Sequence, residues 1–127
     1  MTSARFELYT VSRPNVDTLA VAPPMVVTWR LLSSNNRDLG RAPDPFPDAV
    51  SCLFTVRRLQ RLLDTVVARP ARASGVAWIW RVRLDGVEIA VSSRAYQRRV
   101  QAESACTVFL SLARTATVTD VPRLVRG

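Results

Sequence analysis

The residues best suited to chemistry in this sequence are its arginines. All 18 basic residues are arginine, and with 10 acidic residues the formal net charge is +8. A guanidinium group binds phosphate or carboxylate through paired hydrogen bonds, so clustered arginines are candidates for anion binding. The clusters with this potential contain Arg57, Arg58, Arg61, Arg94, Arg98 and Arg99. A solvated surface whose arginine stems cover apolar neighbours explains the same charges without a ligand, and we favour it because no nucleic-acid-binding motif accompanies them.

The residues that are absent exclude most enzyme classes. Without histidine there is no imidazole base and no Ser-His or Cys-His couple, and without lysine there is no Schiff base or phosphate-binding lysine. The two cysteines, Cys52 and Cys106, are too few for a four-ligand zinc site, and we expect them to be buried, reduced thiols. The acidic residues show no spacing typical of a two-carboxylate hydrolase. We therefore expect a protein that is not an enzyme and has no catalytic residue, metal or cofactor.

Length and hydropathy indicate a single globular domain. The chain has 127 residues, of which 48% are apolar and 22% are charged, so we assign residues 1–127 to one domain. The first ten residues resemble no signal sequence, and no uncharged apolar run approaches the roughly 18 residues of a membrane span. We expect a cytoplasmic protein that has no membrane partner.

Alternating residues predict two strands that present arginines on one side. In the second strand we expect the core-facing residues to be Val76, Trp78, Trp80, Val82 and Leu84. In the first strand the core-facing residues are Val27, Trp29 and Leu31. The opposite sides form the candidate interaction surface: Thr28, Arg30, Leu32, Ile79, Arg81 and Arg83. The tryptophans fall on the side away from the arginines, which argues against a base-stacking sheet.

Turn residues and helical spacing complete the expected elements. Asn35-Asn36 and Asp85-Gly86 favour tight turns, so strands return over residues 37–41 and 87–92. The apolar spacing then changes to that of helices over residues 49–63 and 102–113, with Pro47 in the first helical turn. Further strands are expected at residues 6–9 and 65–68, followed by an adaptable loop over residues 11–25 and a shorter connection over residues 70–75. A last edge strand falls within residues 115–121.

The sequence also repeats itself. Thr28-Trp29-Arg30-Leu31 matches Ile79-Trp80-Arg81-Val82 at an offset of 51. The prediction is therefore an α+β fold of two tandem pseudo-symmetric β-β-β-α repeats, with an antiparallel sheet packed on two helices. The repeats cover residues 4–63 and 64–121, and residues 122–127 form a frayed tail.

These motifs resemble those of a known family. The segments that carry the resemblance are Phe6-Glu7-Leu8-Tyr9, Trp29-Arg30-Leu31, Trp80-Arg81-Val82, Gly86-Val87-Glu88-Ile89-Ala90 and Tyr96 before an alanine-rich helix. They are similar to the YegP-like family of small bacterial proteins, whose members carry tandem β-β-β-α repeats. The resemblance covers about residues 5–120 and implies the fold. It implies no activity and no catalytic residue.

Two functions follow from the sequence. The leading hypothesis is a small binding module that acts through the exposed sheet face or edges, with a second copy of the chain or another protein as partner. The alternative is a sequence-indifferent nucleic-acid binder that uses the arginine surface. No small-molecule substrate is indicated.

Overall fold

The structure is a computed structural model that describes residues 4–12, 25–119 and 122–124. Along the chain, three strands precede a helix twice, and two short strands follow. The elements are β1 (Arg5–Ser12), β2 (Met25–Leu32), β3 (Asp38–Arg41), α1 (Ala49–Arg61), a 3-10 turn η1 (Leu63–Thr65), β4 (Val67–Arg72), β5 (Trp78–Leu84), β6 (Val87–Val91), α2 (Arg99–Thr115), β7 (Thr117–Val118) and β8 (Arg123–Leu124).

The strands form one mixed sheet with the order β4-β5-β6-β3-β2-β1-β7, and β8 also pairs with β1. Neighbouring strands from β4 to β1 are antiparallel, whereas β7 and β8 run parallel to β1. The prediction of an antiparallel sheet is therefore wrong at this edge. The chain that leaves α2 already runs in the same direction as β1, so β7 pairs with β1 in parallel. The class is α+β, as predicted.

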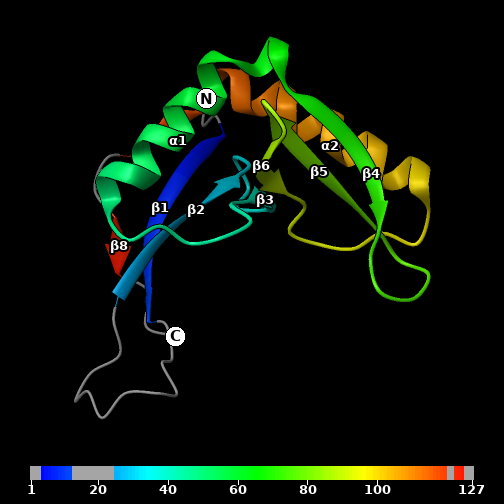
Figure 1. The fold of residues 1–127 in the computed structure, drawn as a ribbon, viewed down its shortest axis with the longest axis horizontal. Helices are drawn as coiled ribbons and strands as arrows, with labels where there is room; N and C mark the ends of the chain where they lie inside the picture. Colours follow the sequence, from blue (N-terminus) through cyan, green and yellow to red (C-terminus); the bar gives the residue numbers. More distant parts are fainter. Residues whose placement is uncertain (1–3, 13–24, 120–121, 125–127) are drawn as a thin grey trace.

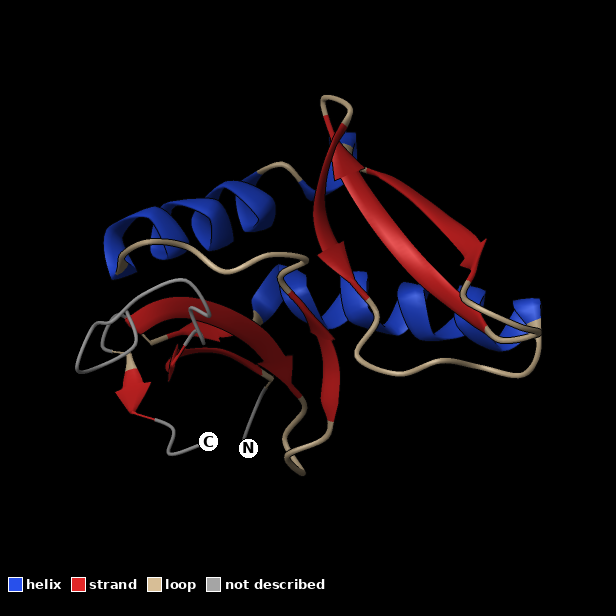
Figure 2. Cartoon of the chain, turned by 60° about the horizontal axis from the view of Figure 1, so that its bottom comes forward, coloured by secondary structure: helices blue, strands red, loops and turns tan. Residues whose placement is uncertain are grey.

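The strands in the middle of the sheet share the fewest paired residues. A single residue pair, Arg41 with Val91, joins β3 to β6, and the strands lie in two groups (Figure 2). Helix α1 packs against β1 and β2, and α2 packs mainly against β4 and β5 (Figure 1). One face of each group is thus covered by a helix, and the other face is available to form a site.

Three aromatic rings connect the two groups of strands. Trp29 on β2 stacks on Phe109 of α2 with ring centroids 6.4 Å apart, and Trp80 on β5 lies 4.6 Å from the same Phe109 ring. All three side chains are fully buried. Gly40 on β3 lies against this cluster, since a Cβ atom there would be 2.6 Å from Trp80 and 2.7 Å from Phe109. The inward direction predicted for Trp29 and Trp80 is confirmed.

The start of α1 and the last described residues differ from the prediction. Helix α1 is capped by Asp48, whose side chain accepts a hydrogen bond of 2.7 Å from the backbone N–H of Ser51. Pro47 therefore precedes the cap and does not lie in the first helical turn. Hydrogen bonds from the backbone and the side chain of Ser51 hold the pKa of Asp48 below its usual value. Part of the expected frayed tail, Arg123–Leu124, is strand β8.

The fourth strand is later and longer than predicted. The chain forms the turn η1 first, so β4 begins at Val67 and extends through Pro70 to Arg72. Proline is tolerated because β4 is an edge strand, where a missing N–H need not cost a ladder hydrogen bond. Val76, expected in the core, lies before β5 and is 79% exposed. Most of the predicted adaptable loop, residues 13–24, lies outside the described residues.

The predicted turns are confirmed by the backbone. Asn36 has φ of 66°, Asp85 of 52° and Gly86 of 79°, the left-handed conformation that asparagine, aspartate and glycine tolerate best. The turn at Asp85-Gly86 joins β5 directly to β6, and so fixes which residues of β5 face outward.

Candidate functional site

The predicted interaction surface is divided between two places on the sheet. Thr28, Arg30 and Leu32 lie on β2, and Ile79, Arg81 and Arg83 lie on β5. Strands β6 and β3 separate β5 from β2, which corresponds to about 14 Å at the usual spacing between strands. The six residues therefore do not form one continuous surface.

The β2 part is closed by its own contacts. Arg30 donates a hydrogen bond of 2.8 Å to Glu7 on β1, and its guanidinium lies 5.0 Å from the ring centroid of Tyr9. Leu32, predicted to be exposed, is only 4% exposed. It lies opposite Arg5 on β1, whose guanidinium hydrogen-bonds to the Asn36 side chain, so these polar groups enclose the leucine. The prediction that Leu32 is exposed is wrong for this reason.

The β5 part is more accessible. Arg83 is exposed, and the Arg81 side chain is 42% exposed although it forms a 2.7 Å ion pair with Glu88 on β6. Ile79 is partly buried and lies opposite Ala71 on β4. The outward direction predicted for Arg81 and Arg83 is therefore confirmed, whereas Ile79 offers less surface than expected.

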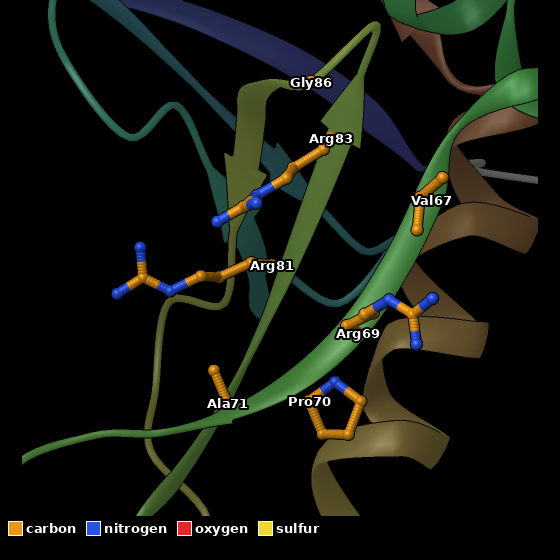
Figure 3. A pocket seen from close by; sticks show the side chains of 7 residues that line it. All are labelled: Val67, Arg69, Pro70, Ala71, Arg81, Arg83 and Gly86. Atoms are coloured by element: carbon orange, nitrogen blue, oxygen red, sulfur yellow. The ribbon is translucent and has the colours of Figure 1, made fainter.

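A hollow of about 340 Å³ lies on this side of β4 and β5. Its lining combines three arginines with small apolar residues: Val67, Arg69, Pro70, Ala71, Arg81, Arg83 and Gly86. Figure 3 shows Arg81 and Arg83 extending to one side of it and Arg69 to the other. Within the described part of the chain, Glu88 pairs with Arg81 and no acidic side chain pairs with Arg69 or Arg83. We call this feature the β4–β5 hollow.

The strand register gives the hollow an excess of positive charge. In the β1–β2 hairpin the residue opposite Arg30 is Glu7, whereas in the β4–β5 hairpin the residue opposite Arg81 is Arg69. Like charges at directly opposed positions destabilise a strand pair. The divergent directions of Arg69 and Arg81 in Figure 3 reduce this repulsion. Arg30, which also lies opposite Arg41 on β3, is therefore neutralised by Glu7 within its own hairpin. Arg81 is neutralised by Glu88 on β6, and Arg69 forms no ion pair in the described chain.

The predicted anion-binding arginines are not brought together. Arg58 near the end of α1 pairs with Asp85 in the turn after β5, at 3.2 Å. Arg99 at the start of α2 lies 5.7 Å from the ring of Trp78, the first residue of β5. The two groups therefore lie at opposite ends of β5, about 20 Å apart for seven residues of extended chain. The remaining four are exposed and form no ion pair within the described residues: Arg57, Arg61, Arg94 and Arg98.

The Trp78 ring is in contact with two arginines. It was expected in the core with Trp80, but it is only partly buried. Its ring lies 4.9 Å from the guanidinium of Arg72 and also contacts Arg99. Cation–π contacts of this kind occupy the ring, so a base would have to displace an arginine before it could stack.

Of the residues that line the hollow, only Arg81 and Arg83 were among the predicted site residues, and five were missed: Val67, Arg69, Pro70, Ala71 and Gly86. The proline indicated a loop, and the expected strand therefore ended before Arg69. The alternation of Val67, Arg69 and Ala71, each two residues apart, is the signal that could have extended that strand on one face.

The buried groups offer no reactive chemistry in the described chain. Cys52 is fully buried and Cys106 is 5% exposed, and both are free thiols as predicted. Burial raises the pKa of Cys52 to about 12 and that of Cys106 to about 11. No group of three or more acidic or cysteine side chains able to hold a metal ion occurs among the described residues. No helix of the described chain is long and apolar enough to cross a bilayer.

Comparison with known proteins establishes the class of fold. No protein-family profile matches the chain, and no curated protein matches its sequence. Two solved structures do match, so the mixed sheet with two helices is the fold of YegP-like proteins, as the resemblance predicted.

The first match is the solution structure of YegP from E. coli, a protein of unknown function. It is 14% identical in sequence, with a TM-score of 0.64 over 100% of this chain and 98% of YegP. The second is a UPF0339 protein from Shewanella oneidensis, 12% identical, with a TM-score of 0.61 over 92% of this chain and 90% of that protein. At these identities the likeness concerns the fold alone.

Proposed function

We propose that this chain is a non-enzymatic binding module that binds an acidic protein partner through the outer face of β4 and β5. The observation that carries the proposal is the pair of opposed arginines, Arg69 and Arg81, where the other hairpin has an ion pair. Arg69 and Arg83 lack acidic partners in the described chain. Two arginines without acidic partners beside a third that is already paired with Glu88 are a local excess of charge of the sort that proteins retain at functional sites.

A protein partner fits the hollow better than nucleic acid does. Val67, Pro70 and Ala71 contribute an apolar part to the lining, whereas a phosphate backbone is bound by positive charge along a continuous path. The described arginine clusters at the two ends of β5 do not form such a path, and the Trp78 ring is occupied by arginines. Nucleic-acid binding is therefore the alternative, and the experiment must distinguish it from binding of a protein partner.

A different protein is a better partner than a second copy of the chain at this face. In a two-fold symmetric contact the same patch meets itself, so Arg83 and Arg69 would approach their own copies without acidic partners. An acidic surface neutralises the same groups and gains from complementary charge. The proposal is thus a hetero-association.

The tandem-repeat organisation is part of the same proposal. The backbone N–H of Ala42 donates to Trp29 O at 3.1 Å, and that of Ser92 donates to Trp80 O at 3.0 Å. Val27 pairs with Phe46, and Trp78 pairs with Tyr96. These matching contacts support two related halves around Trp29 and Trp80, of which the second contributes the arginines of the β4–β5 hollow.

A comparison of charge-reversal variants tests the proposed function. Arg83→Glu should abolish capture of the partner from an extract of the native host, and capture by the original protein should survive nuclease treatment. Arg61→Glu is the matched control, because Arg61 is exposed and has no acidic partner in the described chain. Equal loss in both variants, or loss on nuclease treatment, would contradict the proposal. Thermal unfolding of both variants shows whether the fold is retained.

A further inference from the structure

We infer that the β4–β5 hollow is a carboxylate subsite, which takes an aspartate or glutamate side chain of the partner together with an adjacent aliphatic side chain. The inference rests on the proposed function and specifies the chemistry at its centre. It assigns the anion to Arg83 and Arg69, and the aliphatic group to Val67 and Ala71.

The charge of the hollow determines what group it attracts. Of the three guanidiniums, Arg81 already bonds Glu88 at 2.7 Å, and Arg83 extends in the same direction as Arg81 (Figure 3). Arg69 is exposed at the edge strand and pairs with no acid among the described residues. A carboxylate accepts two parallel hydrogen bonds from one guanidinium. Arg83 is thus the first ligand, and the exposed Arg69 side chain, which extends away from Arg81 and Arg83 in Figure 3, must rotate toward Arg83 to bind the same anion.

The apolar lining indicates that the anion is attached to a hydrocarbon group. Val67 is 49% exposed although it lies in a strand directly opposite Arg83. Pro70 and Ala71 add further small apolar surface beside it. Burying such surface contributes about 25 cal/mol per Å², which a hydrated inorganic ion cannot gain. An acidic side chain with an aliphatic neighbour uses both parts of the lining.

The size of the hollow limits the ligand to a few side chains. A volume of about 340 Å³ lies at the lower end of the range for small-ligand sites, roughly 300–1,000 Å³. It is open on the outer side of the sheet, because the helix that packs on β4 and β5 in the described chain, α2, covers their other face. An extended segment can therefore place one or two side chains in it while the rest of the partner stays outside.

The open edge of β4 indicates that the bound segment of the partner lies across the outer face of the sheet and does not pair with β4 as an additional strand. Trp80 directs its backbone N–H and C=O toward Ser92, on the side of β6. Pro70, which is opposite Trp80, therefore has its backbone nitrogen on the open edge, where it has no hydrogen to donate. This gap interrupts the ladder that strand addition requires. Side-chain capture is the mode that remains.

An NMR titration with simple carboxylates tests the subsite directly. The ¹⁵N-labelled protein is titrated with acetate, butyrate and hexanoate, and with 1-hexanol as the uncharged control. We expect saturable shifts of the Arg69 and Arg83 Nε–H signals and of the amides in β4 and β5. Affinity should increase with chain length, and 1-hexanol should leave the arginine signals unchanged.

Matched variants assign the two parts of the subsite. Arg83→Gln and Arg69→Gln should each weaken hexanoate binding about tenfold or more, because each removes a charge-assisted hydrogen bond. Arg61→Gln, which changes the net charge equally, should bind as the original protein does. Val67→Thr preserves shape and strand preference, and it should reduce the gain from acetate to hexanoate without changing acetate binding.

Several outcomes would overturn the inference. Uniform shifts of all arginine signals would indicate general ionic attraction, and tighter binding of hexyl phosphate than of hexanoate would assign the hollow to phosphate groups. A short oligonucleotide that displaces hexanoate at 0.15 M salt would assign it to nucleic acid. If partner capture depends on Arg83 but hexanoate does not bind, the subsite is wrong and the proposed function stands. If hexanoate binds but capture is independent of Arg83, the proposed function fails instead.

Discussion

At the residue scale, Gly40 is the most constrained position of the core. A methyl group there would overlap the Trp80 and Phe109 rings, at 2.6 and 2.7 Å. We expect Gly40→Ala to lower the free energy of unfolding by about 1–3 kcal/mol, the usual cost of overpacking. Urea denaturation measures this loss. Phe109→Leu in the same chain should recover part of it, because the two changes share one contact; strict additivity would show that Gly40 is constrained by something else.

The buried thiols predict how stability depends on pH. Burial raises the pKa of Cys52 from its ordinary 9.0 to about 12 and that of Cys106 to about 11. Between about pH 9 and pH 11 the unfolded chain loses thiol protons that the folded chain retains, so the free energy of unfolding must fall as pH rises. Below pH 9 both states keep these protons, and the stability is fully present.

Urea midpoints between pH 7 and pH 11 test this dependence. The double variant Cys52→Ala, Cys106→Ala should show a smaller decline above pH 9, whatever its stability at pH 7. Burial also raises the pKa of Tyr9 and Tyr96, so part of the decline remains at higher pH. An unchanged slope in the double variant would exclude the thiols as its source.

The directions of site side chains were predicted correctly where they depend only on the two-residue alternation of a strand. Arg81 and Arg83 point outward as the alternation requires, because a strand cannot rotate one residue without its neighbours. The predicted exposure of Leu32 was wrong because it depends on two other residues. Arg5 is distant in the sequence, and Asn36 lies in a turn. Arg69 was missed because Pro70 indicated a loop, so the predicted strand ended before Arg69.

At the element scale, strand β4 is protected from pairing by one residue. The nitrogen of Pro70 lies on the open edge, so an approaching strand finds no donor at that position. Pro70→Val restores the N–H and adds a residue with high strand preference. We expect this variant to self-associate more readily, as measured by sedimentation velocity across a range of concentrations. Pro43→Val, in a loop outside the strands, is the control that should leave the association state unchanged.

Most elements could be predicted because each carries its own local pattern. The turn at Asp85-Gly86 and both helices follow from residues close in sequence, so their positions were correct within a few residues. The parallel pairing of β7 with β1 was not predicted, since it depends on where the chain leaves α2. The start of β4 was misplaced because Leu63–Thr65 form a 3-10 turn that β-branched residues do not reveal.

At the scale of the whole molecule, the core should make the two groups of strands unfold together. Among the described residues, only Arg41 and Val91 pair between the two groups in the sheet, but Phe109 contacts both Trp29 and Trp80. Gln60 of α1 also donates hydrogen bonds to the Ala113 and Ala116 carbonyls at the end of α2, at 3.1 and 2.7 Å. Each group of strands is therefore stabilised partly by side chains that also pack on the other group.

We expect a single cooperative transition for the original protein. Far-ultraviolet circular dichroism and tryptophan emission should give coincident urea curves. Phe109→Ala should lower the common midpoint by an amount equivalent to about 3–5 kcal/mol. Two separated transitions in the original protein would instead mean that each half is an independent domain.

The different surroundings of the three tryptophans also have an optical consequence. Trp29 and Trp80 are fully buried, and their indole nitrogens have no hydrogen-bond partner in the described chain. Trp78 is partly exposed, and two guanidinium groups lie 4.9 and 5.7 Å from its ring centroid. Two emitters should therefore fluoresce at short wavelength and resist collisional quenching, and the third should emit at longer wavelength. Iodide, drawn to the positive charge around Trp78, should quench that red-shifted component more efficiently than caesium does.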